Sequence, residues 1–126
     1  MAHYIFNFPG EKQQATDLLR AGTWIVPEDE PHRDTLAAGD LALIYLAAPE
    51  RTFIGRVELA SEARDRSVLV TDVEQWDPPV PMAAVLAEMD PSQTAKADFE
   101  PGVVRITATE YETALAVAAG RTASTA

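Results

Sequence analysis

The stretch from Leu36 to Leu59 decides the fold and reads LAAGDLALIYLAAPERTFIGRVEL. Its Gly39-Asp40 pair is a turn signal. The nearly continuous apolar run from 41 to 47 is typical of a strand buried on both faces. After a short polar turn, residues 53–60 predict a second strand, with alternate positions on one side: Phe53, Gly55, Val57 and Leu59. Gly55 within that strand predicts a bulge, a bend or a close backbone approach.

The residues upstream of this stretch predict a strand, a helix and a short extended piece. Residues 3–8 are rich in aromatic and β-branched side chains, and Pro9-Gly10 ends the strand that they predict. Residues 11–21 carry an apolar face of helical period, with Gly22 in the position of a C-terminal cap. An extended piece over 23–26 and a polar loop over 27–33 follow.

The residues downstream predict another strand over 68–76. The proline-rich segment 77–81 is expected to leave the sheet and run extended over the surface. A helix is predicted over 82–89, a turn of helix within 91–100 and a last strand over 103–106. Two overlapping capping boxes, Thr107 with Glu110 and Thr109 with Glu112, predict a final helix that ends at Ala119 with Gly120 as its cap.

These elements predict one α+β domain over residues 1–121 and a flexible tail over 122–126. The three central strands are joined by short turns and should be antiparallel neighbours. The outer strands can flank or close this meander. The expected fold is therefore a small, partly closed β-barrel of five or six mostly antiparallel strands with helices packed outside.

Composition and charge exclude several classes of function. The 126 residues contain no cysteine, which rules out disulfides, thiolate metal sites and a cysteine nucleophile. A net charge of −10 disfavours non-specific binding to a phosphate backbone. The four arginines at 51, 56, 64 and 66 form either a local basic patch or a set of solvated residues. With no signal peptide and no long apolar run, a cytoplasmic location without membrane contact is expected.

Catalytic and metal-binding motifs are missing from the sequence. It contains no Gly-x-Ser-x-Gly elbow, no His-Glu-x-x-His helix and no glycine-rich phosphate loop. The acidic run Glu28-Asp29-Glu30 is interpreted as a solvated loop, because adjacent side chains rarely form a closed cation site. We therefore expect no enzyme activity, no metal and no cofactor.

The order and spacing of several segments resemble those of EVE-domain proteins, whose PUA-like fold is shared with ASCH and YTH domains. The resemblance covers almost the whole chain. It is carried by the following segments: 4–7, 18–22, Trp24, 36–40, Ile44-Tyr45, 54–58, 73–81, 102–106 and Glu110-Tyr111.

The resemblance implies a five- or six-stranded barrel that binds nucleic acid without catalysis and holds a modified base in an aromatic pocket. Trp24 occupies the position of the tryptophan that forms one wall of that pocket in YTH and EVE relatives, and Asn7 matches a polar pocket position. The sequence differs from these relatives in two respects that bear on the ligand. The turn at 62–66 is short and has no aromatic residue to supply a second ring, and the acidity of the chain favours a free nucleoside, a nucleotide or one extruded base.

Each candidate ligand-binding residue also has a structural interpretation. Trp24 can stack on a base or fill the core. Tyr45 is either a ligand contact or a core residue, and Trp76-Asp77 either reads a base edge or covers the end of the barrel. Asn7 can bind a base edge or satisfy backbone groups. The remaining candidates are His32, in the loop after Trp24, and Arg56.

Two alternative functions remain open on the sequence. One is an interaction module whose acidic face binds a basic protein partner. The other is a small-molecule hydrolase of the ASCH type, for which the resemblance implies a lysine, a glutamate and a tyrosine near the pocket. Lys12 and Lys96 are the two lysines, and neither lies on a predicted barrel strand. The oligomeric state and the choice between DNA, RNA and free nucleotide are not determined by the sequence.

Overall fold

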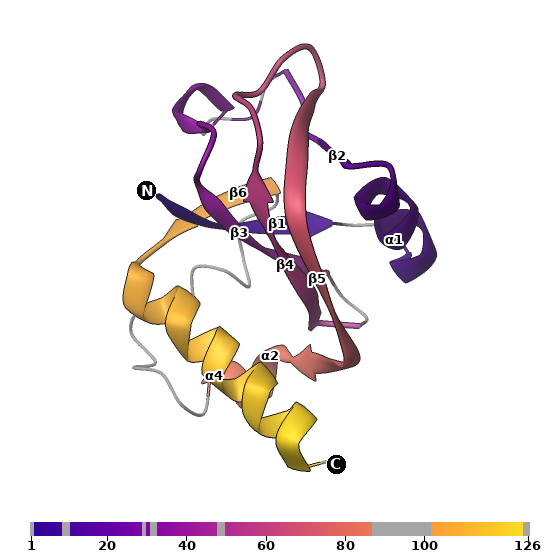
Figure 1. Cartoon of the computed structure of the whole chain (residues 1–126), viewed down its shortest axis with the longest axis vertical. Helices are drawn as coiled ribbons and strands as arrows, with labels where there is room; N and C mark the ends of the chain where they lie inside the picture. The colour runs from indigo at the N-terminus through magenta and orange to yellow at the C-terminus, as the bar shows by residue number, and fades with distance from the viewer. Residues whose placement is uncertain are drawn as a thin grey trace.

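Six strands form one curled mixed sheet in the order β2-β5-β4-β3-β1-β6, a half-barrel with helices outside it (Figure 1). The computed structural model describes residues 2–8, 11–28, 30, 33–47, 50–86 and 102–124. The elements are β1 (His3–Phe8), α1 (Lys12–Arg20), β2 (Thr23–Ile25), η1 (Arg33–Thr35), β3 (Leu41–Leu46), β4 (Thr52–Leu59), β5 (Ser67–Pro81), α2 (Met82–Leu86), β6 (Gly102–Ile106) and α4 (Ala108–Ser124).

The central meander predicted from the sequence is confirmed. Strand β3 pairs antiparallel with β4, and β4 pairs antiparallel with β5. Strand β1 joins the other side of β3 in parallel, from His3 opposite Leu41 to Phe8 opposite Leu46, and β6 pairs antiparallel with β1. The α+β fold with a mostly antiparallel, partly closed barrel is therefore as expected.

The Gly39-Asp40 turn connects this sheet to the N-terminal residues. Gly39 has a φ of 93°, which a residue with a side chain rarely adopts. The Asp40 carboxylate is 6 % exposed. Its two oxygens accept backbone N–H groups of Ala2 and Ala37, each at 3.0 Å. Asp40 therefore has a structural role, because it holds the start of β1 beside the turn that leads into β3.

Gly55 lies where β4 and β5 approach most closely. A Cβ atom at this position would fall on the carbonyl oxygen of Glu74 and 3.2 Å from the Cα of Gln75. The pairing also shifts here, since Ile44 pairs with Gly55 while Tyr45 pairs with Phe53. The predicted close backbone approach and bulge are confirmed.

The bulge corrects the side-chain alternation expected along β4. Phe53 was expected on the same side as Val57 and Leu59, but it packs in a different core cluster from them, and Ile54 takes the place beside those two residues. One extra residue in the strand reverses the facing of every side chain before it.

The prolines near residue 80 do not end β5, which corrects another expectation. The strand continues to Pro81, with Val80 opposite Phe53 and Pro81 opposite Thr52. The register is irregular between Gln75 and Val80. Strand β2 covers the other edge of β5 only at residues 67–69. The prolines therefore lie where β5 has one neighbour and a missing N–H donor is tolerated.

Capping residues were predicted at the end of α1 and at both ends of α4. Gly22 has a φ of 76° directly after α1, as predicted for a cap glycine. At the start of α4, the N–H of Glu110 donates to Thr107 Oγ1 at 3.1 Å and the N–H of Thr107 donates to Glu110 Oε1 at 3.0 Å. The first capping box is thus confirmed. Gly120 as the final cap is wrong, because α4 continues to Ser124 and includes most of the expected tail.

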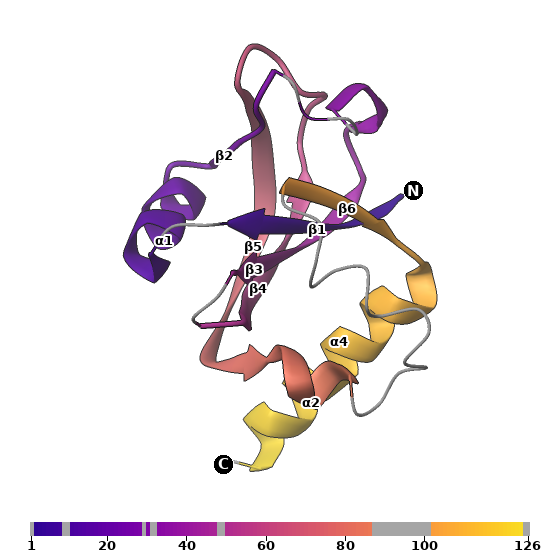
Figure 2. The ribbon, with the colours of Figure 1, turned by 180° about the vertical axis from the view of Figure 1, so that it is seen from behind.

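Two clusters of buried side chains lie on opposite faces of the sheet. The first contains Phe6, Trp24 and Val57, and it is covered by Ala15 and Leu19 of α1. The second contains Tyr45, Phe53 and Trp76, and it is covered by α2 and α4. Both ribbon views show α1 on its own and α2 packed beside α4 at the other end of the molecule (Figures 1 and 2). The chain after α2 up to residue 101, including the predicted turn at 91–100, lies outside the described residues.

Candidate ligand-binding groove

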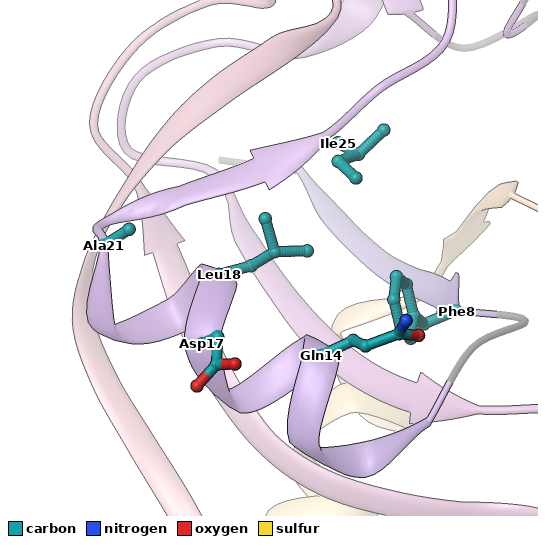
Figure 3. Close-up of a pocket in the computed structure, with 6 residues that line it drawn as sticks. All are labelled: Phe8, Gln14, Asp17, Leu18, Ala21 and Ile25. Carbon is teal, nitrogen blue, oxygen red and sulfur yellow. The ribbon is translucent and has the colours of Figure 1, made fainter.

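A groove open to solvent lies between α1, β2 and the end of β1 (Figure 3). Its volume is about 440 Å³, which is within the range of small-molecule sites. Four of the lining side chains are apolar and two are polar: Phe8, Leu18, Ala21 and Ile25, with Gln14 and Asp17. The groove therefore offers an apolar bed with a few polar groups on its rim.

Local sequence patterns build this groove. In α1, Ala15 and Leu19 are buried in the first core cluster, and Leu18 beside them is half-buried at the groove. Gly22 then turns the chain sharply into β2. Neighbouring strand residues face opposite ways, so Trp24 enters the core while Ile25 points outward and remains 50 % exposed.

Trp24 lies one aromatic ring behind the groove. Its indole is 3 % exposed. It stacks on Phe6 with ring centroids 6.3 Å apart and meets the Phe8 ring at 5.3 Å. Phe8 therefore supplies the aromatic ring that lines the groove, and the buried Trp24 ring does not line it.

The two polar residues of the rim lie one helical turn apart on α1. The Gln14 side-chain oxygen accepts the N–H of Glu11 at 3.1 Å in a capping box. Gln13 Nε2 donates to Asp17 Oδ1 at 2.9 Å. The Gln14 amide group lies beside Phe8, whereas the Asp17 carboxylate points away from Phe8 and Ile25 and places a negative charge on the rim (Figure 3).

Three other predicted site residues lie on the opposite face of the sheet. Tyr45 is 2 % exposed and packs against Phe53 with ring centroids 5.1 Å apart. Trp76 is 6 % exposed, and its Nε1 donates to Glu74 Oε1 at 3.0 Å. Arg56 Nε donates to the other oxygen of Glu74, also at 3.0 Å. Glu74 thus links Arg56 to Trp76 at the edge of the second core cluster.

The structure therefore does not bring the predicted site residues into a single pocket. Asn7 lies in β1 opposite Tyr45 and Gly102, on the strand face opposite that of Phe6 and Phe8. The Trp24 indole is separated from Tyr45 and Trp76 by the sheet itself. His32 and the Asp77 side chain lie outside the described residues.

The Tyr111 hydroxyl is the buried polar atom without a hydrogen bond among the described residues. Burial raises the pKa of Tyr111, and nearby Glu74 and Glu58 raise it further, against the lowering effect of the Arg56 guanidinium. Burial lowers the pKa of Arg56, but Tyr111 and Glu74 outweigh this and raise it. The His3 ring lies 5.0 Å from the Tyr111 ring. This cluster joins α4 to the sheet.

Sequence reasoning did not select the residues that line the groove. Phe8 follows the period-two pattern of Tyr4 and Phe6, which is the signal that could have placed it beside Trp24. Ile25 could have been found as the outward neighbour of a buried tryptophan. Asp17 carries no signal of its own, because its proximity to β2 depends on how α1 packs.

The described part of the chain has no residues arranged as a metal site and no membrane-spanning helix. No group of three histidine, cysteine, aspartate or glutamate side chains there could hold a metal ion. In that same part, every helix is too short or too polar to cross a membrane.

Comparisons with known proteins are informative at the level of structure. No family model matches the sequence, and no curated protein matches it. Solved structures do match. A Rhodopseudomonas palustris protein solved by NMR has a TM-score of 0.69 at 18 % identity, over 94 % of each chain. A hypothetical protein of Leishmania major has a TM-score of 0.78 at 13 % identity, over 97 % of each chain. The ASCH protein of Zymomonas mobilis has a TM-score of 0.59 at 10 % identity, over 91 % of this chain and 94 % of the other.

The fold is PUA-like. The curled six-stranded sheet with flanking helices matches the fold of the ASCH protein over nearly the full length of both chains. At identities of 10–18 % these likenesses establish the fold alone. The function of this PUA-like domain therefore has to be argued from its groove.

Proposed function

We propose that this PUA-like domain is a non-catalytic binding module that holds a nucleobase, free or within a nucleoside or a single strand, in the groove between α1 and β2. The observation that carries the proposal is the groove itself, about 440 Å³ in volume, with an aromatic ring and aliphatic side chains below and two polar groups on the rim. A planar base requires this combination, since its faces stack and its edges form hydrogen bonds.

The resemblance of the sequence to EVE domains supports a modified base as the ligand. In this proposal Phe8 provides the ring against which the base stacks, and Trp24 supports Phe8 from behind at 5.3 Å. Leu18 and Ile25 contact the rest of the ligand, and Gln14 binds its polar edge. Stacking of a base on one aromatic side chain contributes about 1–3 kcal/mol.

The charge of the chain favours a small ligand over a long strand. The net charge is −10, and the charged residue lining the groove is Asp17. Binding to a phosphate backbone needs clustered Lys and Arg. The proposed ligand is therefore a free nucleoside or a single base presented by another molecule.

Titration of nucleosides tests this proposal. Adenosine, cytidine and their N-methylated forms are added to the protein, with isothermal calorimetry and tryptophan fluorescence as readouts. Replacement of Phe8 by leucine keeps an apolar side chain but removes the ring, and it should weaken binding by about tenfold. Absence of binding at millimolar nucleoside, or equal affinity in the Phe8→Leu variant, would contradict the proposal.

A matched pair of exposed aliphatic residues provides the control. Ile25 and Leu69 are 50 % and 55 % exposed. The register, with Thr23 opposite Leu69 and Ile25 opposite Ser67, places both on the outer face of the β2–β5 pair. Only Ile25 lines the groove. Ile25→Ala should weaken nucleoside binding several-fold, whereas Leu69→Ala should leave it unchanged.

The same two exposed residues favour a second candidate, an interaction module for a basic protein partner. An apolar pair on an acidic surface is typical of a contact site with a polar rim. If this candidate is right, Leu69→Ala weakens partner binding as much as Ile25→Ala, and added salt weakens it further. The ASCH-type hydrolase is not supported by the groove, because Lys12 is exposed in the first turn of α1 and does not line it.

A further inference from the structure

We propose that the groove selects a planar heteroaromatic ring that carries a positive charge over a neutral ring of the same size. This inference rests on the proposed function and specifies the chemical class of its ligand. Of the six lining side chains, Asp17 is the charged one, and the ring that lines the groove belongs to Phe8. Both groups attract a cation, the carboxylate by its charge and the ring by the electron density of its face.

Asp17 lies on the rim of the groove, with its carboxylate turned away from Ile25 and Phe8, so it acts on a stacked ligand through its charge (Figure 3). Figure 3 shows Asp17 and Gln14 on consecutive turns of α1, while Ile25 lies across the groove on β2 and Phe8 lies at its end. A ring resting on the apolar residues therefore directs one edge toward the helix. Asp17 Oδ1 already accepts a hydrogen bond from Gln13 at 2.9 Å. This bond helps to hold the carboxylate, and its charge, at the rim of the groove.

The basic residues of α1 lie outside the groove. Lys12 begins the helix and Arg20 ends it, and neither lines the groove. The other charges of the chain are predominantly acidic, with 20 Asp and Glu against 10 Lys and Arg. Both the local carboxylate and the overall field therefore favour a cationic ligand and disfavour a phosphorylated one.

The expected selectivity is moderate because Asp17 is exposed and water screens its charge. A partly solvated carboxylate and a ring face together should increase the affinity for the cation by about five- to tenfold. This preference should decrease when the salt concentration rises, whereas stacking of the neutral ring should change little.

Two isomeric nucleosides make the test direct. 1-Methyladenosine is protonated and cationic at pH 7, whereas its isomer N6-methyladenosine stays neutral and lacks the extra proton. Calorimetric titration of both into the full chain should give five- to tenfold tighter binding of 1-methyladenosine. In Asp17→Asn the preference should decrease to the smaller part that the Phe8 ring supplies. Asp72→Asn is the matched control, because Asp72 is an exposed residue of β5 outside the groove and its φ of 47° suits asparagine. That variant changes the net charge by the same amount and should keep the preference.

The possible results separate the two proposals. Binding of both isomers with equal affinity, or tighter binding of N6-methyladenosine, overturns the selection for a cation and leaves the base-binding function in place. A preference that is undiminished in Asp17→Asn, or that decreases equally in Asp72→Asn, also overturns the role assigned to the groove carboxylate. Binding of neither isomer, with other nucleosides inactive as well, overturns the proposed function itself.

Discussion

Replacement of Trp24 by alanine distinguishes a core tryptophan from a pocket wall. The indole is 3 % exposed and contacts the rings of Phe6 and Phe8. A buried aromatic side chain covers about 150–250 Å², which at about 25 cal/mol per Å² corresponds to roughly 4–6 kcal/mol. Measured losses for tryptophan-to-alanine changes in cores are about 3–5 kcal/mol. We therefore expect Trp24→Ala to lower the free energy of unfolding by about 4 kcal/mol.

Chemical denaturation measures this loss directly. Far-UV circular dichroism follows urea unfolding of wild type and variant, because the substitution removes one of the two tryptophans and alters the fluorescence signal. For a domain of this length, about 4 kcal/mol corresponds to a fall in Tm of roughly 15 °C. Ile25→Ala serves as the neighbouring control, since this side chain is 50 % exposed and should cost less than about 1 kcal/mol.

A loss of less than about 1 kcal/mol in Trp24→Ala would contradict the burial, because removal of a buried indole from a core costs several times more. Such a small loss would mean that the Trp24 indole of the wild-type protein is accessible, as a pocket wall would require. A second measurement uses Trp76→Phe, which leaves Trp24 as the single tryptophan. Its emission should be blue-shifted and poorly quenched by acrylamide, and an emission typical of water-exposed indole would also contradict the burial.

Three further predictions concern the sheet and its helical cover. Gly55→Ala should cost about 3 kcal/mol in urea unfolding, because its Cβ overlaps the Glu74 carbonyl oxygen; a cost below about 1 kcal/mol would mean that β4 and β5 separate easily. Asp40→Asn should cost about 1–3 kcal/mol, since an amide can accept only one of the two backbone N–H groups; unchanged stability would contradict the role of the carboxylate. The raised pKa of Tyr111 means that the folded state favours its protonated form. Its stabilising effect is therefore present below pH of about 10 and is lost as the pH rises through the folded pKa, so Tyr111→Phe should lose less stability than wild type between pH 8 and 11, and parallel profiles would refute this.

Local patterns determined much of the secondary structure and the topology of the central sheet. The apolar run of β3 and its short connections predicted the meander, because neighbouring strands joined by short turns pair antiparallel. Gly22 and Gly55 were interpreted correctly, since a helix end and a close backbone approach leave few alternatives to glycine. The first capping box predicted where α4 begins.

Where local signals were wrong, long-range contacts outweighed them. The prolines after Trp76 were expected to end the strand, but β5 continues to Pro81 because it has a single neighbour there. Gly120 was expected to cap the last helix, yet α4 continues through it. A glycine within a helix costs only about 1 kcal/mol relative to alanine, and Ala114 and Ala118 pack in the second core cluster.

The sequence by itself determined the α+β class and the antiparallel central strands, because periodicity, turns and caps act over a few residues, and the resemblance to EVE domains added the PUA-like fold. Only the tertiary structure decided where a ligand could bind. The curl and bulge of the sheet put Trp24 on one face and Tyr45 with Trp76 on the other. The packing of α1 against β2 then brought Phe8, Asp17 and Ile25 together around a groove. These residues belong to three different elements, β1, α1 and β2. Their proximity therefore depends on how the elements pack, which a single sequence does not reveal.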